Sequence, residues 1–211
     1  DHKRVGEGDK GKNTGGMGCY SPSRLLSTKL DEKINNKIII PTLNAIKDMG
    51  SVYIGFLYVG LMIKNEKPYL IEFNVRMGDP ECQTILPLLE NDLSEIFFDC
   101  CAGKLSEKKI KLSNKKSICI VLCSKGYPED YKKDSEISKL NKLSLKDNEY
   151  IYHAGTKLKD NKILNSGGRV LNFVSTSNNL KESRNDLIKL IKKLDWENGF
   201  FRKDIAYKVI D

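Results

Sequence analysis

Apolar and polar residues alternate strictly along residues 71–76, which read Ile-Glu-Phe-Asn-Val-Arg. Successive side chains of a strand point to opposite faces, so this pattern predicts a strand. Glu72, Asn74 and Arg76 would share one face, and the three apolar side chains would share the other. The alternative is an exposed strand whose polar face has no functional role.

The apolar run at 52–63 predicts a long buried strand upstream of this segment. Residues 64–68 combine charged residues, asparagine and proline, which is typical of a turn. Residues 69–75 would then return antiparallel to the first strand. The sequence therefore predicts a β-hairpin whose second arm carries the polar face.

Helical spacing is visible on both sides of this hairpin. Ile34, Ile38 and Ile39 would share one face of a helix that Pro41 bends or interrupts, because proline lacks the N–H that continues a helix. Asn91–Asp92 supply caps for a second, short amphipathic helix.

The last hundred residues follow a polar stretch at 103–116 that reads as a linker. Apolar runs at 118–123, 150–153 and 170–174 predict strands, and the apolar stripe from 180 to 194 predicts an amphipathic helix. This is an α+β module of a common domain size.

Composition narrows the class of protein. The 211 residues are 39% hydrophobic and 30% charged, which is ordinary for a globular protein, and no apolar run is long enough for a membrane span. The net charge of +8 comes from scattered lysines with acids interspersed and without aromatic interleaving. We therefore expect a solvated basic surface, with no nucleic-acid and no membrane partner.

The six cysteines suggest no disulfide framework or zinc site. No Cys-x-x-Cys pair occurs, and the only histidines are His2 and His153. Buried free thiols in a reducing compartment, the cytoplasm, are expected.

Candidate chemistry lies on the predicted polar face. A carboxylate and a carboxamide are hard oxygen ligands, and Arg76 adds a fixed cation, which together suit a nucleotide-bound magnesium ion and developing negative charge. The following turn carries two further carboxylates, Asp79 and Glu81. These two could instead serve as caps for the segment beyond Pro80.

The glycine-rich segment at 5–18 is the second candidate. Its end, Asn13–Gly18, is called the glycine loop below and reads Asn-Thr-Gly-Gly-Met-Gly. Glycine tolerates positive φ, so backbone N–H groups could approach an anion closely. The segment is neither a Walker loop nor a dinucleotide fingerprint. A flexible surface loop is the alternative, but residues 1–4, taken together with Glu72, Asn74 and Arg76, favour a ligand cradle.

These motifs together resemble the phosphoribosylamine–glycine ligase (glycinamide ribonucleotide synthetase) family of the ATP-grasp superfamily. The resemblance extends over essentially the whole chain and corresponds to the C-terminal half of the family's typical length. It rests on residues 1–22, 55–62, 72–81, 153–156, 167–171 and 202–205.

The resemblance implies an α+β fold: the C-terminal lobe of an ATP-grasp domain (antiparallel sheet with helices) at 1–113, followed by a small α/β closing domain at 114–211. It implies ATP-dependent ligation of 5-phosphoribosylamine and glycine in purine synthesis. The missing N-terminal half of the same protein is then a partner. We expect this chain alone to bind ATP weakly, and the 6–18 segment to be mobile without that half.

The resemblance also implies residue roles. Glu72 and Asn74 would hold Mg²⁺ (or Mn²⁺), and Arg76 would be catalytic. Substrate or phosphate contacts would come from Lys3, Arg4, Asn13, Thr14, Gly15, Gly16, Met17, Gly18, Asp79 and Glu81. Tyr58 stands near where many ATP-grasp enzymes carry another metal-binding carboxylate, which puts a second ion in doubt.

Two other classes remain open at this point. One is another ATP-grasp carboxylate–amine ligase, and the other is a non-catalytic nucleotide-binding fragment. Intact Glu72, Asn74 and Arg76 argue against the fragment, and the glycine loop favours the purine enzyme.

Overall fold

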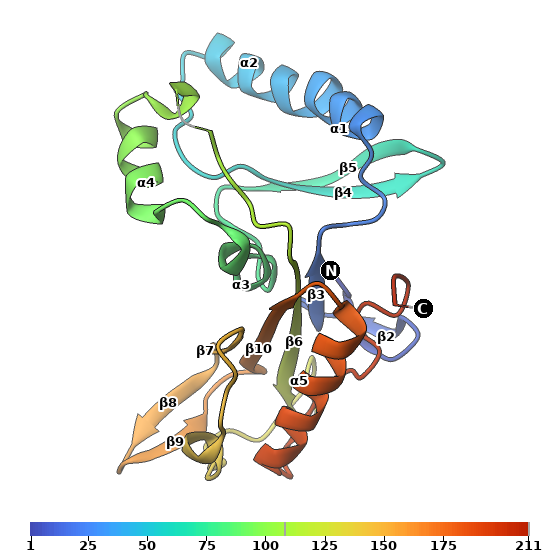
Figure 1. Cartoon of the computed structure of the whole chain (residues 1–211), viewed down its shortest axis with the longest axis vertical. Coiled ribbons are helices and arrows are strands. Elements are labelled where there is room, and N and C mark those ends of the chain that lie inside the picture. The colour runs from blue at the N-terminus through green and yellow to red at the C-terminus, as the bar shows by residue number, and fades with distance from the viewer. Residues whose placement is uncertain (108, 211) are drawn as a thin grey trace. The chain divides into compact units, whose positions relative to one another are not determined.

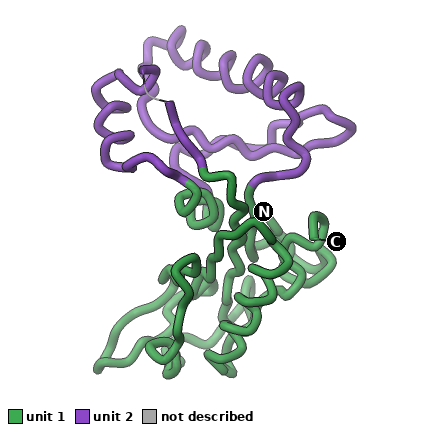
Figure 2. The backbone as a smooth tube through the Cα atoms, viewed as in Figure 1, with its two compact units in different colours: residues 1–21, 79–88, 113–211 green, residues 22–78, 89–112 purple. Residues whose placement is uncertain are grey.

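The computed structural model describes residues 1–107 and 109–210 (Figure 1). Its chain forms two compact units, each assembled from separate segments (Figure 2). Unit 1 comprises residues 1–21, 79–88 and 113–211, and unit 2 comprises 22–78 and 89–112. The predicted domain boundary after residue 113 stays a prediction. None of the described helices is long and apolar enough to cross a membrane.

Unit 1 is built on antiparallel strands. Its elements are β1 (Arg4–Gly6), β2 (Lys10–Asn13), β3 (Gly18–Ser21), α3 (Glu81–Ile85), a 3₁₀ turn (Leu86–Leu88), β6 (Lys116–Ser124), a 3₁₀ turn (Leu140–Lys142), β7 (Glu149–His153), β8 (Thr156–Lys159), β9 (Lys162–Asn165), β10 (Arg169–Ser177), α5 (Leu180–Leu194) and β11 (Gly199–Phe200). The main sheet has the order β11-β6-β10-β7, and β3 also pairs with β6. Helix α5 packs on β10 and β6 and buries its apolar stripe there.

The α+β class and the strands and helix predicted for the last hundred residues are confirmed. The hairpin β8–β9 was not predicted, because its two short strands lie in lysine-rich text that gives little apolar alternation. Its turn residues Asp160 and Asn161 both have positive φ, which suits a two-residue hairpin turn.

The reading of the glycine-rich segment as a loop is wrong. Strands β1 and β2 form a hairpin, and β3 pairs with β6 in the register Gly18↔Ile120 and Cys19↔Cys119. A Cβ at Gly18 would lie 2.4 Å from the Cys119 carbonyl oxygen, so only glycine permits this approach. The segment is therefore part of the sheet structure of unit 1.

In its described residues, unit 2 contains the predicted hairpin, three α-helices, a π-helical segment and a 3₁₀ turn. Its elements are α1 (Thr28–Ile34), a π-helical segment (Asn35–Ile39), α2 (Ile40–Asp48), β4 (Tyr58–Lys64), β5 (Lys67–Asn74), α4 (Leu93–Cys101) and a 3₁₀ turn (Leu105–Glu107). The predicted interruption near Pro41 is confirmed as the π-helical turn that precedes it. Asp92 caps α4 as predicted.

The hairpin β4–β5 is confirmed, but its predicted bounds were wrong. Residues 52–57 are not a strand, and Val52 is 84% exposed in this chain. Gly55 has φ 140°, outside the extended region, so the apolar run does not continue the strand upstream of Tyr58. The turn lies at Asn65–Glu66, both with positive φ, and Pro68 belongs to β5.

Candidate functional site

The polar face of β5 brings Glu72 and Asn74 together in unit 2. The Asn74 amide Nδ2 donates a hydrogen bond to Glu72 Oε1 at 3.2 Å. On the neighbouring strand, Gly60 lies opposite Glu72 and Tyr58 lies opposite Asn74. A Cβ at Gly60 would lie 3.0 Å from Glu72 Cγ, so glycine at this position gives the carboxylate its room.

Arg76 does not continue the face of β5. The strand ends at Asn74, and Arg76 lies in the bend that follows, where its Nη1 donates to the Met77 carbonyl at 2.9 Å. The alternation in sequence continues beyond the point where the backbone leaves the extended conformation. The prediction that all three polar side chains share one strand face is therefore correct only for Glu72 and Asn74.

The paired oxygens of Glu72 and Asn74 fit a magnesium ion bound to nucleotide phosphates. Mg²⁺ prefers oxygen ligands and commonly takes one or two protein side chains while the substrate phosphates supply the others. Among the described residues, no cluster of three His, Cys, Asp or Glu side chains could hold a metal by itself. Tyr58 stands across from Asn74, so that position supplies no second carboxylate.

The predicted carboxylate Asp79 belongs to unit 1 and is held by Arg169 from the start of β10. Arg169 Nη2 lies 2.8 Å from Asp79 Oδ2, and Nη1 donates to the Asp79 carbonyl at 2.7 Å. Asp79 Oδ1 also accepts from Gln83 Nε2 at 3.1 Å. Glu81 lies in the first turn of α3. Arg169 therefore holds Asp79 through an ion pair and a hydrogen bond to its backbone.

The glycine loop has its backbone donors occupied by the protein. The N–H of Thr14 donates to the Lys3 carbonyl and the N–H of Gly16 to Thr14 Oγ1. The N–H of Gly15 donates to Tyr127 Oη at 2.9 Å, and that of Met17 to the His2 carbonyl. Because these four N–H groups all donate to acceptors in the protein, they do not form an anion cradle in this conformation.

Two basic residues before the loop contact it or the strand β2 that leads into it. Lys3 forms an ion pair with Asp1 at 2.7 Å, and its Nζ lies 3.5 Å from the Gly15 carbonyl oxygen. Arg4 Nη1 donates to the Gly11 carbonyl at 2.8 Å. Both side chains are exposed, so they remain candidates for substrate contacts.

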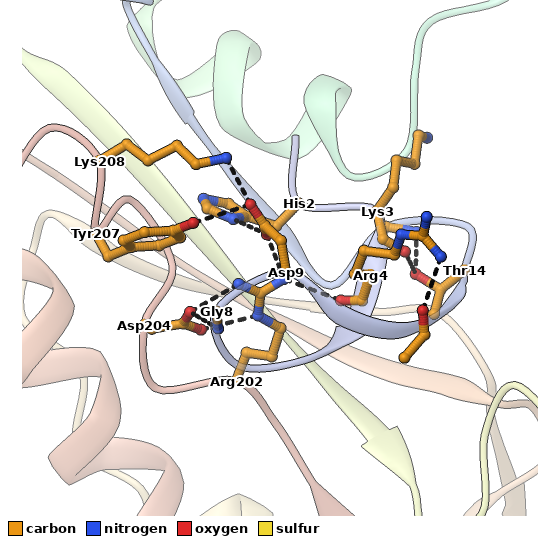
Figure 3. Close-up of polar contacts among 12 residues, drawn as sticks. His2, Lys3, Arg4, Gly8, Asp9, Thr14, Arg202, Asp204, Tyr207 and Lys208 are labelled. Carbon is orange, nitrogen blue, oxygen red and sulfur yellow. Dashed lines mark hydrogen bonds and ion pairs between the residues drawn. The ribbon is translucent and has the colours of Figure 1, made fainter.

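A buried guanidinium anchors the glycine-rich segment to the end of the chain (Figure 3). Arg202 is 1% exposed, and both its Nε and Nη2 donate to the Asp204 carboxylate at 2.8 Å. Its Nη1 donates to Asp9 Oδ1 at 3.0 Å and to the Arg4 carbonyl at 2.9 Å. A bidentate pair with a further carboxylate satisfies a buried charge well.

Asp9 and Asp204, the two carboxylates of this network, make further hydrogen bonds between the glycine-rich segment and residues 204–208. The Gly8 N–H donates to Asp204 Oδ2 at 2.7 Å. Asp9 Oδ2 accepts from Tyr207 Oη at 3.0 Å and from Lys208 Nζ at 2.5 Å (Figure 3). Residues 202–208, together with β6, therefore anchor the 6–18 segment, which was expected to be mobile without the other half.

His2 connects this network to the glycine loop. Its Nε2 accepts from the Ala206 N–H at 2.9 Å, so its Nδ1, 3.4 Å from Asp9 Oδ1, carries the proton of the neutral ring. Its backbone N–H donates to the Gly18 carbonyl, and its carbonyl accepts from the Met17 N–H. The side chain contacts the C-terminal segment while the backbone holds the end of the loop.

Electrostatics favour a neutral His2 and a charged Asp9. Burial, and then the positive charge of Arg202, lowers the pKa of His2 to about 4. Burial would raise the pKa of Asp9, but hydrogen bonds from Lys208 and Arg202 outweigh it and hold the pKa well below its usual range. Protonation of His2 would set a cation beside Arg202 and remove the acceptor of the Ala206 N–H.

Stability should therefore fall in mild acid. The pKa of His2 is lower in the folded state than the ordinary 6.5, so its contribution is present above pH 6.5 and is lost as pH falls toward about 4. We expect about 1–2 kcal/mol lower free energy of unfolding at pH 5 than at pH 7, measured by urea denaturation. His2→Gln should flatten this dependence, and an equal slope in the variant would contradict the assignment.

The sequence alone did not predict that His2, Asp9, Tyr127 and Arg202 hold the glycine-rich segment. Arg202 lies in a segment that carried the family resemblance, which was the available signal. Tyr127 lies in a turn that gave no chemical signal. The six cysteines are free as predicted; three are buried, and Cys101 is exposed.

Two models of one protein family match this chain. The model described as the phosphoribosylglycinamide synthetase ATP-grasp (A) domain matches residues 1–82, and the model of that synthetase's C domain matches residues 117–208. Curated relatives carry the name phosphoribosylamine–glycine ligase. The one from Haemophilus influenzae is 43% identical over 100% of this chain, and the one from Caldanaerobacter subterraneus is 45% identical over 98%. This chain spans about half the length of these relatives, 49% of each.

Solved structures give the same result for the fold. The crystal structure of phosphoribosylamine–glycine ligase from Thermotoga maritima superposes with a TM-score of 0.84 at 33% identity, over 98% of this chain and 50% of that one. The biotin carboxylase domain of Hydrogenobacter thermophilus 2-oxoglutarate carboxylase superposes with a TM-score of 0.61 at 14% identity, over 91% and 40%, a likeness of fold alone. The ATP-grasp fold class is therefore confirmed.

Proposed function

Because this chain belongs to the phosphoribosylglycinamide synthetase family, we propose that it takes part in joining 5-phosphoribosylamine and glycine to glycinamide ribonucleotide, with ATP converted to ADP and phosphate. The observation that carries this proposal is the Glu72–Asn74 pair on β5, set inside a matched ATP-grasp domain. The substrates would be three small molecules, and the reaction is a step of purine biosynthesis.

The proposed reaction has two steps. A glycine carboxylate oxygen attacks the γ-phosphorus of ATP, the bond to ADP breaks, and glycyl phosphate forms. The amine of phosphoribosylamine then attacks the acyl carbon, loses a proton, and expels inorganic phosphate as the amide bond forms. Both steps develop negative charge on phosphoryl oxygens, so fixed positive charge is what the protein must supply.

Unit 2 would bind the phosphates of ATP. Glu72 and Asn74 would hold a divalent cation, Mg²⁺ or Mn²⁺, and that ion when bound neutralises phosphate charge. Arg76 would stabilise the charge at the transferring phosphoryl group, for which its planar guanidinium is suited. Its position just beyond β5 keeps it on the same short segment as the two oxygen ligands.

Unit 1 would bind the other substrates. The side chains of Asn13 and Thr14 in the glycine loop, with Lys3 and Arg4, would contact glycine or phosphoribosylamine, since the loop N–H groups already have protein acceptors. Asp79 and Glu81 would hold the ammonium group. Asp79 keeps a 43% exposed side chain although Arg169 binds it, so it remains accessible to a small cation.

The remaining half of the protein would complete the site. Unit 2 exposes large apolar side chains before, within and just after its hairpin, among them Val52 at 84%, Ile71 at 64% and Val75 at 77%. We propose that the part corresponding to the first half of the relatives covers these side chains. The complete protein is this chain joined to that part. Six free cysteines support a cytoplasmic location.

A coupled ADP-release assay on the complete protein tests the proposal. Release should be fast only when glycine and phosphoribosylamine are supplied together, and glycinamide ribonucleotide should form in equal amount. Release that depends on a different carboxylate would favour another ligase of the superfamily. An inactive protein that still binds ATP would favour a non-catalytic role.

Arg76→Lys should lower kcat about tenfold or more and change the KM for ATP much less. Lysine keeps the charge but not the planar fork, so contacts made mainly in the transition state are lost. Steady-state kinetics on the complete protein measure both constants, and Arg24→Lys, at an exposed position of unit 2, is the matched control. Parallel loss of ATP affinity and turnover would instead make Arg76 a ground-state phosphate ligand.

A further inference from the structure

Tyr127, in the turn after β6, binds the glycine loop at one peptide group. Its hydroxyl oxygen accepts the Gly15 N–H at 2.9 Å. At the other end of the residue, the Gly15 carbonyl oxygen accepts from Arg169 Nη1 at 3.2 Å. Gly15 is therefore held through both its N–H and its C=O by side chains that follow it by more than a hundred residues.

The ring of Tyr127 is fixed in place by Gly168. A Cβ at position 168 would lie 2.2 Å from Tyr127 Cδ2, so no other residue leaves room for the ring in this position. The Gly168 carbonyl accepts from the Ser124 N–H at 2.7 Å, which ties the glycine to the end of β6. Tyr131 packs edge-on against Tyr127 with ring centroids 6.5 Å apart. Packing against Gly168 and Tyr131 therefore fixes the ring in the position from which its hydroxyl reaches the Gly15 N–H.

The same support continues into Arg169. Besides Gly15, this guanidinium binds the carbonyl and the carboxylate of Asp79 at 2.7 and 2.8 Å. A Cβ at Gly15 would lie 3.0 Å from the guanidinium carbon, which explains the close approach of loop and side chain. Tyr127 and Arg169 thus set the position of Gly15 relative to Asp79.

The loop needs this support at Gly15 because its next residue packs tightly. Gly16 has φ 130°, and a Cβ there would lie 2.6 Å from Pro80 Cδ. Among the residues that the structure describes, the Gly16 N–H bonds within the loop, to Thr14 Oγ1 at 3.0 Å. A rotation of the Gly15 N–H would therefore move the loop away from the 79–80 turn, since within the described part of the chain Tyr127 is the acceptor that holds this N–H.

We propose that Tyr127 is a positioning residue of the synthetase reaction: its hydroxyl holds the Gly15 peptide so that the glycine loop and Asp79 keep the arrangement that the non-nucleotide substrates require. This inference rests on the proposed function. Tyr127 acts through Gly15 and needs no contact with substrate. The nucleotide phosphates, assigned to Glu72, Asn74 and Arg76, should be insensitive to it.

Tyr127→Phe in the complete protein tests the role, because it removes one hydroxyl and leaves the ring on Gly168. We expect the KM for glycine or for phosphoribosylamine to rise roughly three- to tenfold, as for one lost hydrogen bond, while the KM for ATP stays within twofold. Amide hydrogen exchange of residues 14–17 should become faster. Tyr131→Phe is the matched control and should change neither readout.

The outcomes separate the two claims. A wild-type protein without ligase activity would overturn the proposed function and this role with it. An active wild type with unchanged kinetics in Tyr127→Phe would overturn the positioning role alone. A variant whose KM values for all three substrates and melting temperature change together would also overturn it, because the hydroxyl would then support the fold as a whole.

Discussion

Glu72→Gln should reduce turnover of the complete protein about a hundredfold or more while leaving it folded. The substitution keeps the shape of the side chain and its acceptor for the Asn74 amide, and removes one negative charge. If that charge holds the divalent cation, several kcal/mol of charge stabilisation at the phosphoryl group are lost with it. Steady-state kinetics measure the loss, and it should be partly relieved by high Mg²⁺ concentration.

Glu66→Gln is the control for this variant. Glu66 lies in the turn of the same hairpin, exposed and outside the proposed site, so its neutralisation should leave turnover unchanged. A structural role for Glu72 gives the opposite pattern: a lower melting temperature with normal specific activity in the folded fraction. That pattern would remove Glu72 from the metal site.

Arg202→Met should lower the free energy of unfolding by about 3 kcal/mol, because breaking a buried charge network leaves its partners unpaired. Asp9 and Asp204 would lose the guanidinium that binds both of them. Methionine is of similar length and apolar, so packing in the site is largely kept. Urea denaturation at pH 7 measures the change, and hydrogen exchange should become faster in residues 4–13.

Lys203→Met is the matched control, since Lys203 is exposed and adjacent in sequence. It should change the free energy of unfolding by less than about 0.5 kcal/mol, as surface substitutions usually do. Equal effects of the two variants would show that the network of Asp9, Arg202 and Asp204 contributes nothing beyond ordinary surface interactions. The glycine-rich segment would then need another anchor.

Local patterns were sufficient for much of the fold and for the placement of Glu72 beside Asn74. The hairpin β4–β5 and the facing of Glu72 and Asn74 follow from alternation over a few residues, because side-chain direction in a strand has a period of two. Helix α5 follows from its stripe of apolar residues in the same way. Alternation could not show where the strand ends, so Arg76 was placed on it incorrectly.

Contacts between distant residues could not be predicted in this way. Asp9 and Arg202 are separated by 193 positions, and Gly15 and Tyr127 by 112. Nothing in the sequence near Gly15 indicates that a tyrosine hydroxyl accepts its N–H. The glycine-rich segment therefore looked like a free loop, although pairing of β3 with β6 and the Arg202 network hold it.

The fate of the carboxylate oxygens of glycine tests the central claim most directly. The complete protein would be given ATP, phosphoribosylamine and glycine labelled with ¹⁸O in both carboxylate oxygens, and the released phosphate would be analysed by mass spectrometry. If glycine is activated as glycyl phosphate, one labelled oxygen leaves with each phosphate, and the other remains in the amide of the product. Unlabelled phosphate, or ADP formed without glycine, would contradict the account.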